Sequence, residues 1–259
     1  MGLFADIVGR RELLEMLVAR NLKIRYKNSA LGFLWSLLAP LFLILIYAVF
    51  LRVLRFNVDL RLLVTGIVAW QFLALCLGDS LGAIVGNANL VTKAAFPRIV
   101  LPLSTVGANL VNFVLSFVVV MVYLLIAGAP FPAVWLLPFA VLTQFALCLG
   151  VSMLVSCANV FFRDTEHLVS VIMLAWFFLT PVIYPVDLVM GNTAFPAWWK
   201  ALYFVNPMTG IVTVYRMALV GVPNPGTMLL WVSCASAWMI LVVGVTVFRE
   251  HDWRFGDEL

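Results

Sequence analysis

Long apolar stretches without charged residues alternate with short charged segments along the chain. The uncharged stretches cover residues 28–51, 62–78, 99–162, 168–186 and 217–248. A membrane-spanning helix needs about 20 mostly apolar residues, so the third stretch is long enough for two spans. Gly128–Pro132 supplies a turn in its middle, and Pro223–Gly226 places the start of the last helix near Thr227. The pattern predicts an all-α integral membrane protein with six transmembrane helices.

The composition supports a membrane environment. Hydrophobic residues make up 64% of the 259 residues and charged residues only 11%, with a mean hydropathy of +1.10. Soluble domains carry about 25% charged residues, and disordered chains have the opposite bias. Both classes are therefore excluded. The four cysteines stand singly in apolar runs, which is typical of small buried side chains.

The two ends of the chain predict its orientation. Residues 1–30 read as an N-terminal amphipathic helix that lies in the membrane interface, and 31–259 as the six-span domain. Six spans place both termini on one side, where eleven of the sixteen positive residues also fall. The positive-inside rule makes that side cytoplasmic. The basic loop Arg52–Arg61 is an exception, because this topology places it outside.

The segment 184–226 is apolar but interrupted by five prolines. It is too broken for a full span, and irregular backbone at membrane depth is tolerated only where protein covers it or where it lines a cavity. We therefore expect short re-entrant helices that form an outer gating segment before the last span.

Residues with catalytic chemistry are scarce. The sequence has no hydrolase or metal-ligand motif, no catalytic residues and no P-loop, so we expect neither a metal nor a bound nucleotide on this chain. Asp79 is the only acid within a long apolar run, and its position near the cytoplasmic end of the second span favours a structural role. Any energy for uphill transport must come from another polypeptide.

Aromatic residues are abundant instead. The run from Trp176 to Pro185 is dense and suits either a path for sugars or packing between helices. If it lines a path, helical spacing groups Phe177 with Tyr184 on the lining face and leaves Trp176 to pack against a neighbouring helix. If it faces lipid, the lining is expected on the first span, around Trp35 and Phe42.

Small residues form one further pattern. Gly78, Gly82 and Gly86 recur at every fourth residue, which predicts a close approach of helices, either within the chain or between subunits.

Four strings together resemble the permease subunit of ABC exporters for lipid-linked polysaccharides of the O-antigen, capsule and teichoic acid type. They are Arg25–Trp35 (RYKNSALGFLW), Asn87–Arg98 (NANLVTKAAFPR), Phe161–Asp164 (FFRD) and Asn206-Pro207. Their order and spacing cover essentially the whole chain.

The resemblance implies partners and roles. It implies a homodimer in the bacterial cytoplasmic (inner) membrane, bound to two copies of a separate ATPase subunit that carries ATP and Mg. The cargo is a polyprenyl-pyrophosphate-linked polysaccharide that passes between the protomers, along the first and fifth spans. Membrane lipids are the other expected contact, and no nucleic acid is expected.

The resemblance also implies site residues. Arg25 and Lys27 match basic positions where the lipid pyrophosphate would arrive. For the path, the resemblance implies only the first and fifth spans, and the candidate lining residues on them are the aromatic ones named above, Trp35 and Phe42 on the first span and Phe177 and Tyr184 on the fifth. The positions that match the loop docked on the ATPase are Asn89, Lys93, Phe96, Pro97 and Arg98.

Two other functions stay open from the residues alone. One is a passive channel or a secondary carrier without an ATPase, and the other is a membrane-embedded transferase that acts on lipid-linked sugars. The polymer, any carbohydrate-binding domain on the ATPase, and the role of the loop at 52–61 also stay open.

Overall fold

The computed structural model describes residues 10–27, 29, 31–55, 59–93, 96–193 and 196–259. The described part of the chain contains helices, turns and irregular segments but no β-strand, which confirms the all-α fold. The longer helices are α2 (Arg11–Tyr26), α3 (Trp35–Leu54), α4 (Leu60–Leu81), α6 (Val100–Ile126), α7 (Leu137–Phe161), α8 (Thr165–Leu179), α11 (Pro207–Leu219) and α12 (Thr227–His251). The shorter ones are α5 (Ala88–Lys93), α9 (Asp187–Met190), α10 (Ala197–Tyr203), α13 (Phe255–Glu258) and the 3-10 turns η1 (Gly32–Leu34), η2 (Val85–Asn87), η3 (Val134–Leu136) and η4 (Asp252–Arg254).

Five helical segments in the described residues are long and apolar enough to cross a membrane, and they contain α3, α4, α6, α7 and α12. The apolar run at 168–186, the expected fifth span, forms α8, which has 15 residues and is about 22 Å long at ~1.5 Å per residue. The hydrocarbon core of a bilayer is about 30 Å thick. The helix stops at Leu179, within the run, because Thr180 precedes Pro181 and adopts an extended conformation. Six full spans are therefore not confirmed by helix length.

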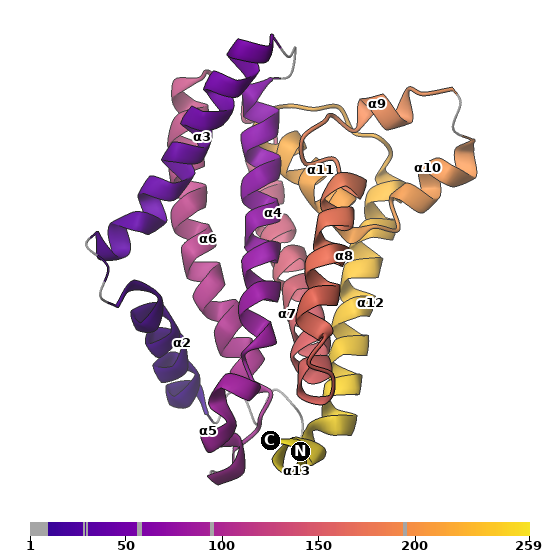
Figure 1. Cartoon of the computed structure of the whole chain (residues 1–259). Coiled ribbons are helices and arrows are strands. Elements are labelled where there is room, and N and C mark those ends of the chain that lie inside the picture. Colours follow the sequence, from indigo (N-terminus) through magenta and orange to yellow (C-terminus); the bar gives the residue numbers. More distant parts are fainter. Residues whose placement is uncertain (1–9, 28, 30, 56–58, 94–95, 194–195) are drawn as a thin grey trace.

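The helices form one elongated bundle around α4, which contacts α3, α6, α7, α8 and α11 (Figure 1). Helices α7 and α12 make the most extensive pair. The short helices α5 and α13 lie at one end of the bundle, while α9 and α10 lie near the opposite end (Figure 1). Helix α8 runs back toward the α9–α10 end, so that α12 can return the chain to the end that holds α13.

Two apolar clusters hold the bundle together. The larger one fills the middle and includes Phe72, Phe113, Leu147 and Tyr215. The smaller one lies where α2, α6, α7, α12 and α13 meet, and its buried members include Leu17, Met153, Phe248 and Phe255. The second cluster ties the two ends of the described chain to the same end of the bundle.

Within the protomer, the close approach of helices lies away from the glycine stripe, and a contact of the stripe between subunits stays a prediction. A Cβ atom on Gly150 of α7 would lie 2.6 Å from the Leu241 Cα atom, and a Cβ on Gly244 of α12 would lie 2.3 Å from the Gly150 carbonyl oxygen. By contrast, a Cβ atom on Gly78 or Gly86 would meet no described atom within 4 Å. Small residues let helix backbones touch, and within the protomer the Gly150–Gly244 pair serves this purpose.

The predicted N-terminal interface helix corresponds to α2, while residues 1–9 lie outside the described part. Leu17 is buried against the α6 end of the bundle, and Val18 lies close to Gly107 on α6. Other side chains of α2, including Met16 and Ile24, are exposed. The helix is therefore anchored on one face, and its position in the membrane interface stays a prediction.

The segment 184–226 contains three helices, α9, α10 and α11, and their re-entrant placement stays a prediction. Asn206 connects this segment to α8. Its Oδ1 atom accepts hydrogen bonds from Met208 N (3.1 Å) and Trp176 Nε1 (2.8 Å), and its Nδ2 atom donates to Thr180 Oγ1 (2.9 Å). The Asn-Pro sequence thus caps α11, with Pro207 in the first turn, and fixes where α8 ends.

Candidate functional site

A polar seam joins α2 to α4 and α6 at the end of the bundle that holds α5. The Arg25 guanidinium forms an ion pair with the Asp79 carboxylate, and Asn109 Nδ2 donates to Asp79 Oδ2 at 2.8 Å. The Arg25 and Asp79 side chains are 28% and 40% exposed. Asp79 therefore connects α2 with α6, and its ion pair with Arg25 is accessible from the surroundings.

Further hydrogen bonds extend the seam in both directions. Arg20 Nη2 donates to Asn87 Oδ1 at 2.6 Å, and the Tyr26 hydroxyl donates to Asn112 Oδ1 at 2.8 Å. A cavity of about 310 Å³ lies within the seam, lined by Asn21, Ile24, Arg25, Asp79, Gly82, Ala83, Asn87, Thr105 and Ala108. The seam is therefore a polar contact between α2 and the bundle, with a cavity beside it.

Arg25 and Lys27, the two basic residues expected at the substrate mouth, have different surroundings. Arg25 lies in the last turn of α2 and its side chain faces Asp79, whereas Lys27 follows the helix and has an extended backbone. Lys27 is exposed and lines an open groove of about 510 Å³ together with Arg20 and Lys23. Arg25 thus pairs with Asp79, whereas Lys27 lines a different groove together with Lys23.

The aromatic run from Trp176 to Pro185 lies partly in α8 and partly in the turn that follows α8. Trp176 packs edge-on against Trp70 of α4 with ring centroids 6.1 Å apart, as its helical spacing predicts. Phe177 is half-buried and also meets Trp70, at 5.4 Å. Tyr184 follows the end of α8, so the prediction that it shares a helical face with Phe177 is wrong, because the helix stops at Leu179.

Tyr184 nevertheless folds back toward α8. Its hydroxyl donates to the Phe178 carbonyl oxygen at 3.1 Å and lies 3.0 Å from the Tyr203 hydroxyl of α10. It therefore connects the outer segment with α8, and a role in lining a path stays a prediction for both Phe177 and Tyr184.

Trp35 and Phe42, the alternative lining residues, lie on α3. Their side chains are 45% and 49% exposed, and the neighbouring Leu41, Leu45 and Ile46 are exposed as well. Helix α3 contacts α4 and α6 on one side only. Its other side is an apolar surface that must contact lipid or another protein.

The residues expected to dock on the ATPase differ in exposure. Asn89 is exposed on α5, whereas Phe96 is half-buried and packs against the smaller apolar cluster. The Arg98 guanidinium binds the Asp252 carbonyl oxygen after α12, and Pro97 precedes it as a half-buried residue. The side chain of Lys93 lies outside the described part. The sequence did not indicate that the C-terminal segment would brace this loop.

Sequence reasoning missed the most buried cation of the described chain. Arg216 of α11 is 2% exposed, and its guanidinium donates to the carbonyl oxygens of Leu62 (3.0 Å), Val182 (2.7 Å) and Tyr184 (2.9 Å). None of the ion pairs among the described residues includes it. Burial lowers the pKa of Arg216 to about 10, so the group stays charged at neutral pH.

Gly66 makes room for this arrangement on α4. A Cβ atom there would lie 2.6 Å from the Val182 carbonyl oxygen and 2.9 Å from Arg216 Nη2. In the assignment of orientation, Arg216 was only one of the five positive residues on the outer side. A signal was present, because a lone cation in an apolar helix without a nearby acid is costly and usually functional.

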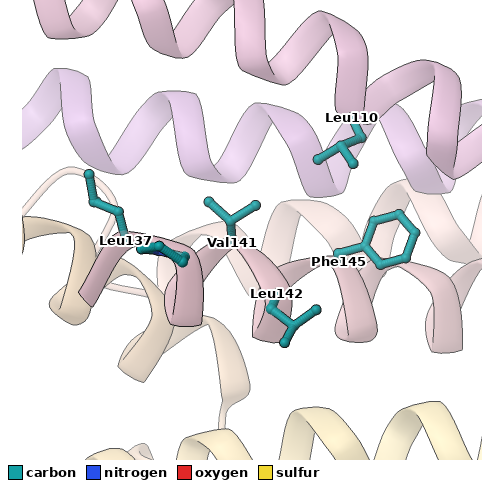
Figure 2. Close-up of a pocket in the computed structure, with 6 residues that line it drawn as sticks. Leu110, Leu137, Val141, Leu142 and Phe145 are labelled. Atoms are coloured by element: carbon teal, nitrogen blue, oxygen red, sulfur yellow. The ribbon is translucent and has the colours of Figure 1, made fainter. Parts of the chain in front are cut away.

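Two further cavities have mainly apolar linings. One of about 470 Å³ lies between α6 and α7, and Figure 2 shows Leu110, Leu137, Val141, Leu142 and Phe145 around it. Another, of about 550 Å³, lies between α7, α11 and α12 and includes Trp135 and Trp231. The described residues hold no group of three His, Cys, Asp or Glu side chains close enough to bind a metal ion. The polar seam and the outer segment are therefore the candidate sites.

Comparison with known proteins identifies the family. Residues 12–220 match the ABC-2 type transporter family. A protein from Myxococcus xanthus described as O-antigen export system permease protein RfbA is 33% identical over 261 residues, which cover 99% of each chain. A Klebsiella pneumoniae protein of the same description is 31% identical over 257 residues, covering 96% of this chain and 95% of the relative. The resemblance inferred from the four strings is confirmed, and the chain belongs to the ABC-2 type transporter family as a multi-pass membrane transport subunit rather than an enzyme.

Proposed function

We propose that the chain is the permease subunit of an ATP-driven ABC exporter that carries a lipid-linked polysaccharide, of the O-antigen type, across the bacterial cytoplasmic membrane. The observation that carries this proposal is similarity over nearly the full length to permeases described as parts of O-antigen export systems. The substrate is inferred to be a polymer on a polyprenyl pyrophosphate. ATP and Mg belong to a separate ATPase subunit.

The proposed assembly is a homodimer with the path between two protomers. Its support is the large apolar surface that one protomer leaves open. Helix α3 exposes Phe42 and Ile46, and α8 exposes Val171, Leu174 and Phe178. A second copy would cover part of this surface, and lipid would cover the rest. In this assembly the path runs past α3 and the α8 region, where Trp35, Phe177 and Tyr184 are the proposed lining.

The proposed ATPase contact lies at the end of the bundle that holds α5 and α13. Asn89 is exposed there, and the Phe96–Arg98 segment is braced by the C-terminal residues. A braced loop can transmit movement of the ATPase into α6, because α6 begins at Val100, two residues after Arg98. This end, and with it both termini, is inferred to be cytoplasmic.

A cross-linking experiment tests this arrangement. The native cysteines Cys76, Cys148, Cys157 and Cys234 are buried, so a single new cysteine reports on one surface position. We expect Asn89→Cys to cross-link to the ATPase. The matched control Asn224→Cys, an exposed asparagine before α12 at the other end, should not cross-link. Instead it should react with a membrane-impermeant thiol reagent added outside the cell. The reverse pattern would refute the orientation.

Removal of the chain from cells tests the function itself. Cells without it should accumulate the polyprenyl-linked polymer inside and lose the surface polymer, and a plasmid copy should restore export. Unchanged surface polymer in cells lacking this chain and any second copy of it would refute the proposed function.

A further inference from the structure

The Arg25–Asp79 ion pair links the expected pyrophosphate mouth to the only acid embedded in a long apolar run. We propose that Asp79 is a specificity-determining counter-ion, which neutralises Arg25 toward ordinary phospholipid head groups and gives it up to the pyrophosphate of the lipid-linked substrate. The inference rests on the proposed function, because it assumes that a prenyl pyrophosphate arrives at α2.

Asp79 is needed because phospholipid head groups compete with the lipid-linked substrate for Arg25. Arginine at a membrane surface attracts any anionic lipid, and the phosphodiester of a phospholipid carries one negative charge. Phospholipids greatly outnumber lipid-linked polymers in a membrane. An unpaired Arg25 would therefore be occupied by the wrong ligand for most of the time. With the Asp79 carboxylate in place, a ligand binds Arg25 only if it outcompetes an existing ion pair.

A pyrophosphate is better equipped to do so. It carries a second negative charge and more acceptor oxygens, so it can take both the fork of the Arg25 guanidinium and a second basic side chain. Arg20, which donates to Asn87 at the wall of the cavity that Arg25 lines, can supply such a cation. A head group with one phosphate gains less from the same exchange.

The exchange is feasible because the ion pair is only partly buried. Partly exposed pairs contribute little to stability, and at 28% and 40% exposure this pair can be broken without stranding a charge in the protein. Asp79 would keep the hydrogen bond from Asn109 Nδ2 after Arg25 leaves. The Asp79 carboxylate therefore keeps one hydrogen-bond partner, Asn109, after Arg25 leaves.

The seam also holds spare hydrogen-bond donors. Arg20 Nε and Asn112 Nδ2 are buried and have no hydrogen-bond partner in the described part of the chain. Unpaired buried donors are uncommon, because each one loses its contact with water. The cavity of about 310 Å³ is lined by the polar side chains of Asn21, Arg25, Asp79 and Asn87, where a phosphate group could meet Arg25.

A binding experiment tests the proposal. The purified permease is placed in nanodiscs of neutral phosphatidylcholine, and the affinities for farnesyl pyrophosphate and for phosphatidylglycerol are measured. Wild-type protein should prefer farnesyl pyrophosphate. Asp79→Asn should bind phosphatidylglycerol about fivefold more tightly, while its affinity for farnesyl pyrophosphate should rise less. The matched control Asp59→Asn removes the acid partner of Arg61 at the other end of α4 and should leave both affinities unchanged.

The outcomes separate the inference from the proposed function. An unchanged affinity ratio in Asp79→Asn, with the wild-type preference intact, would overturn the role of Asp79 alone. A wild-type protein that shows no preference for farnesyl pyrophosphate would overturn the inference and also count against the proposed substrate.

A charge exchange covers the case in which Asp79→Asn unfolds. The double variant Arg25→Asp/Asp79→Arg can re-form the ion pair and should restore thermal stability, but it places a carboxylate on α2 and should not restore export. Recovery of both stability and export would show that the pair is only structural and would overturn the proposal.

Discussion

Replacement of Arg216 by lysine tests how the outer segment is held to the bundle. The arginine fork reaches three carbonyl oxygens on two segments, one on α4 and two in the turn after α8. Lysine keeps the charge but has a single ammonium group in place of the planar fork. We expect Arg216→Lys to loosen the turn that carries Tyr184, with loss of stability and of export.

The magnitude follows from the carbonyl groups left without a donor. The Leu62 carbonyl lies in the first turn of α4, where the helix supplies its own hydrogen bonds. No backbone N–H among the described residues bonds to the Val182 or Tyr184 carbonyl outside helices. The ammonium can serve one of these two, so one stays unpaired, at about 1–3 kcal/mol. For a chain of this size, that corresponds to a fall of roughly 2–12 °C in melting temperature at about 2–4 °C per kcal/mol.

The assay is thermal unfolding of the purified protein in detergent, followed by export measured in cells. Arg61→Lys is the matched control, because the Arg61 side chain is 33% exposed and pairs with Asp59 at 2.7 Å. Its expected effect is below about 1 kcal/mol. Equal melting temperatures for the two variants would refute the view that the carbonyl cradle of Arg216 holds the outer segment.

Other substitutions test the remaining sites. Alanine at Phe177 or Tyr184 should slow polymer export while ATPase coupling and dimer assembly stay measurable, whereas Trp176→Ala should mainly lower the melting temperature; transport lost only in the Trp176 variant would show that the wrong aromatic was chosen. Arg98→Gln should uncouple ATP hydrolysis from export in the reconstituted complex, because the docking loop loses its link to the C-terminal segment, and normal coupling would contradict this. Gly150→Val should separate α7 from α12 and prevent stable expression, which a fluorescence assay of detergent-solubilised protein would detect.

The hydrophobic pattern was sufficient to locate most helices. In lipid each backbone polar group must be paired within the protein, so an uncharged run of suitable length forms a helix almost regardless of its exact residues. The runs that became α3, α4, α6, α7 and α12 behaved in this way. The run at 168–186 did not, because Thr180 before Pro181 stopped the helix and Asn206 forms a hydrogen bond with Thr180 at its end.

The pairing of side chains could not be predicted in the same way. Arg25 and Asp79 are 54 residues apart, and their contact depends on the register with which α2 packs against α4 and α6. The glycine stripe had the right spacing for a helix contact, yet the Gly150–Gly244 pair makes one because those two residues face each other across α7 and α12. Sequence spacing identifies a face of a helix but not the neighbour of that face.

Buried Arg216 shows a second limit. Counting positive charges treats each cation as solvent-exposed, which is useful for orientation. The count cannot recognise a cation whose partners are backbone carbonyls, since every residue carries one. Its partners at 62, 182 and 184 come together only when α11 packs between α4 and the turn after α8.

Transport by the purified complex tests the central claim most directly. The permease and its ATPase are reconstituted into sealed vesicles, and polyprenyl-pyrophosphate-linked polysaccharide is supplied on the ATPase side. We predict that polymer reaches the opposite side only when both proteins, ATP and Mg are present. Polymer that crosses through the permease alone without ATP would identify a passive channel, and it would contradict the assignment of this chain to an ATP-driven exporter.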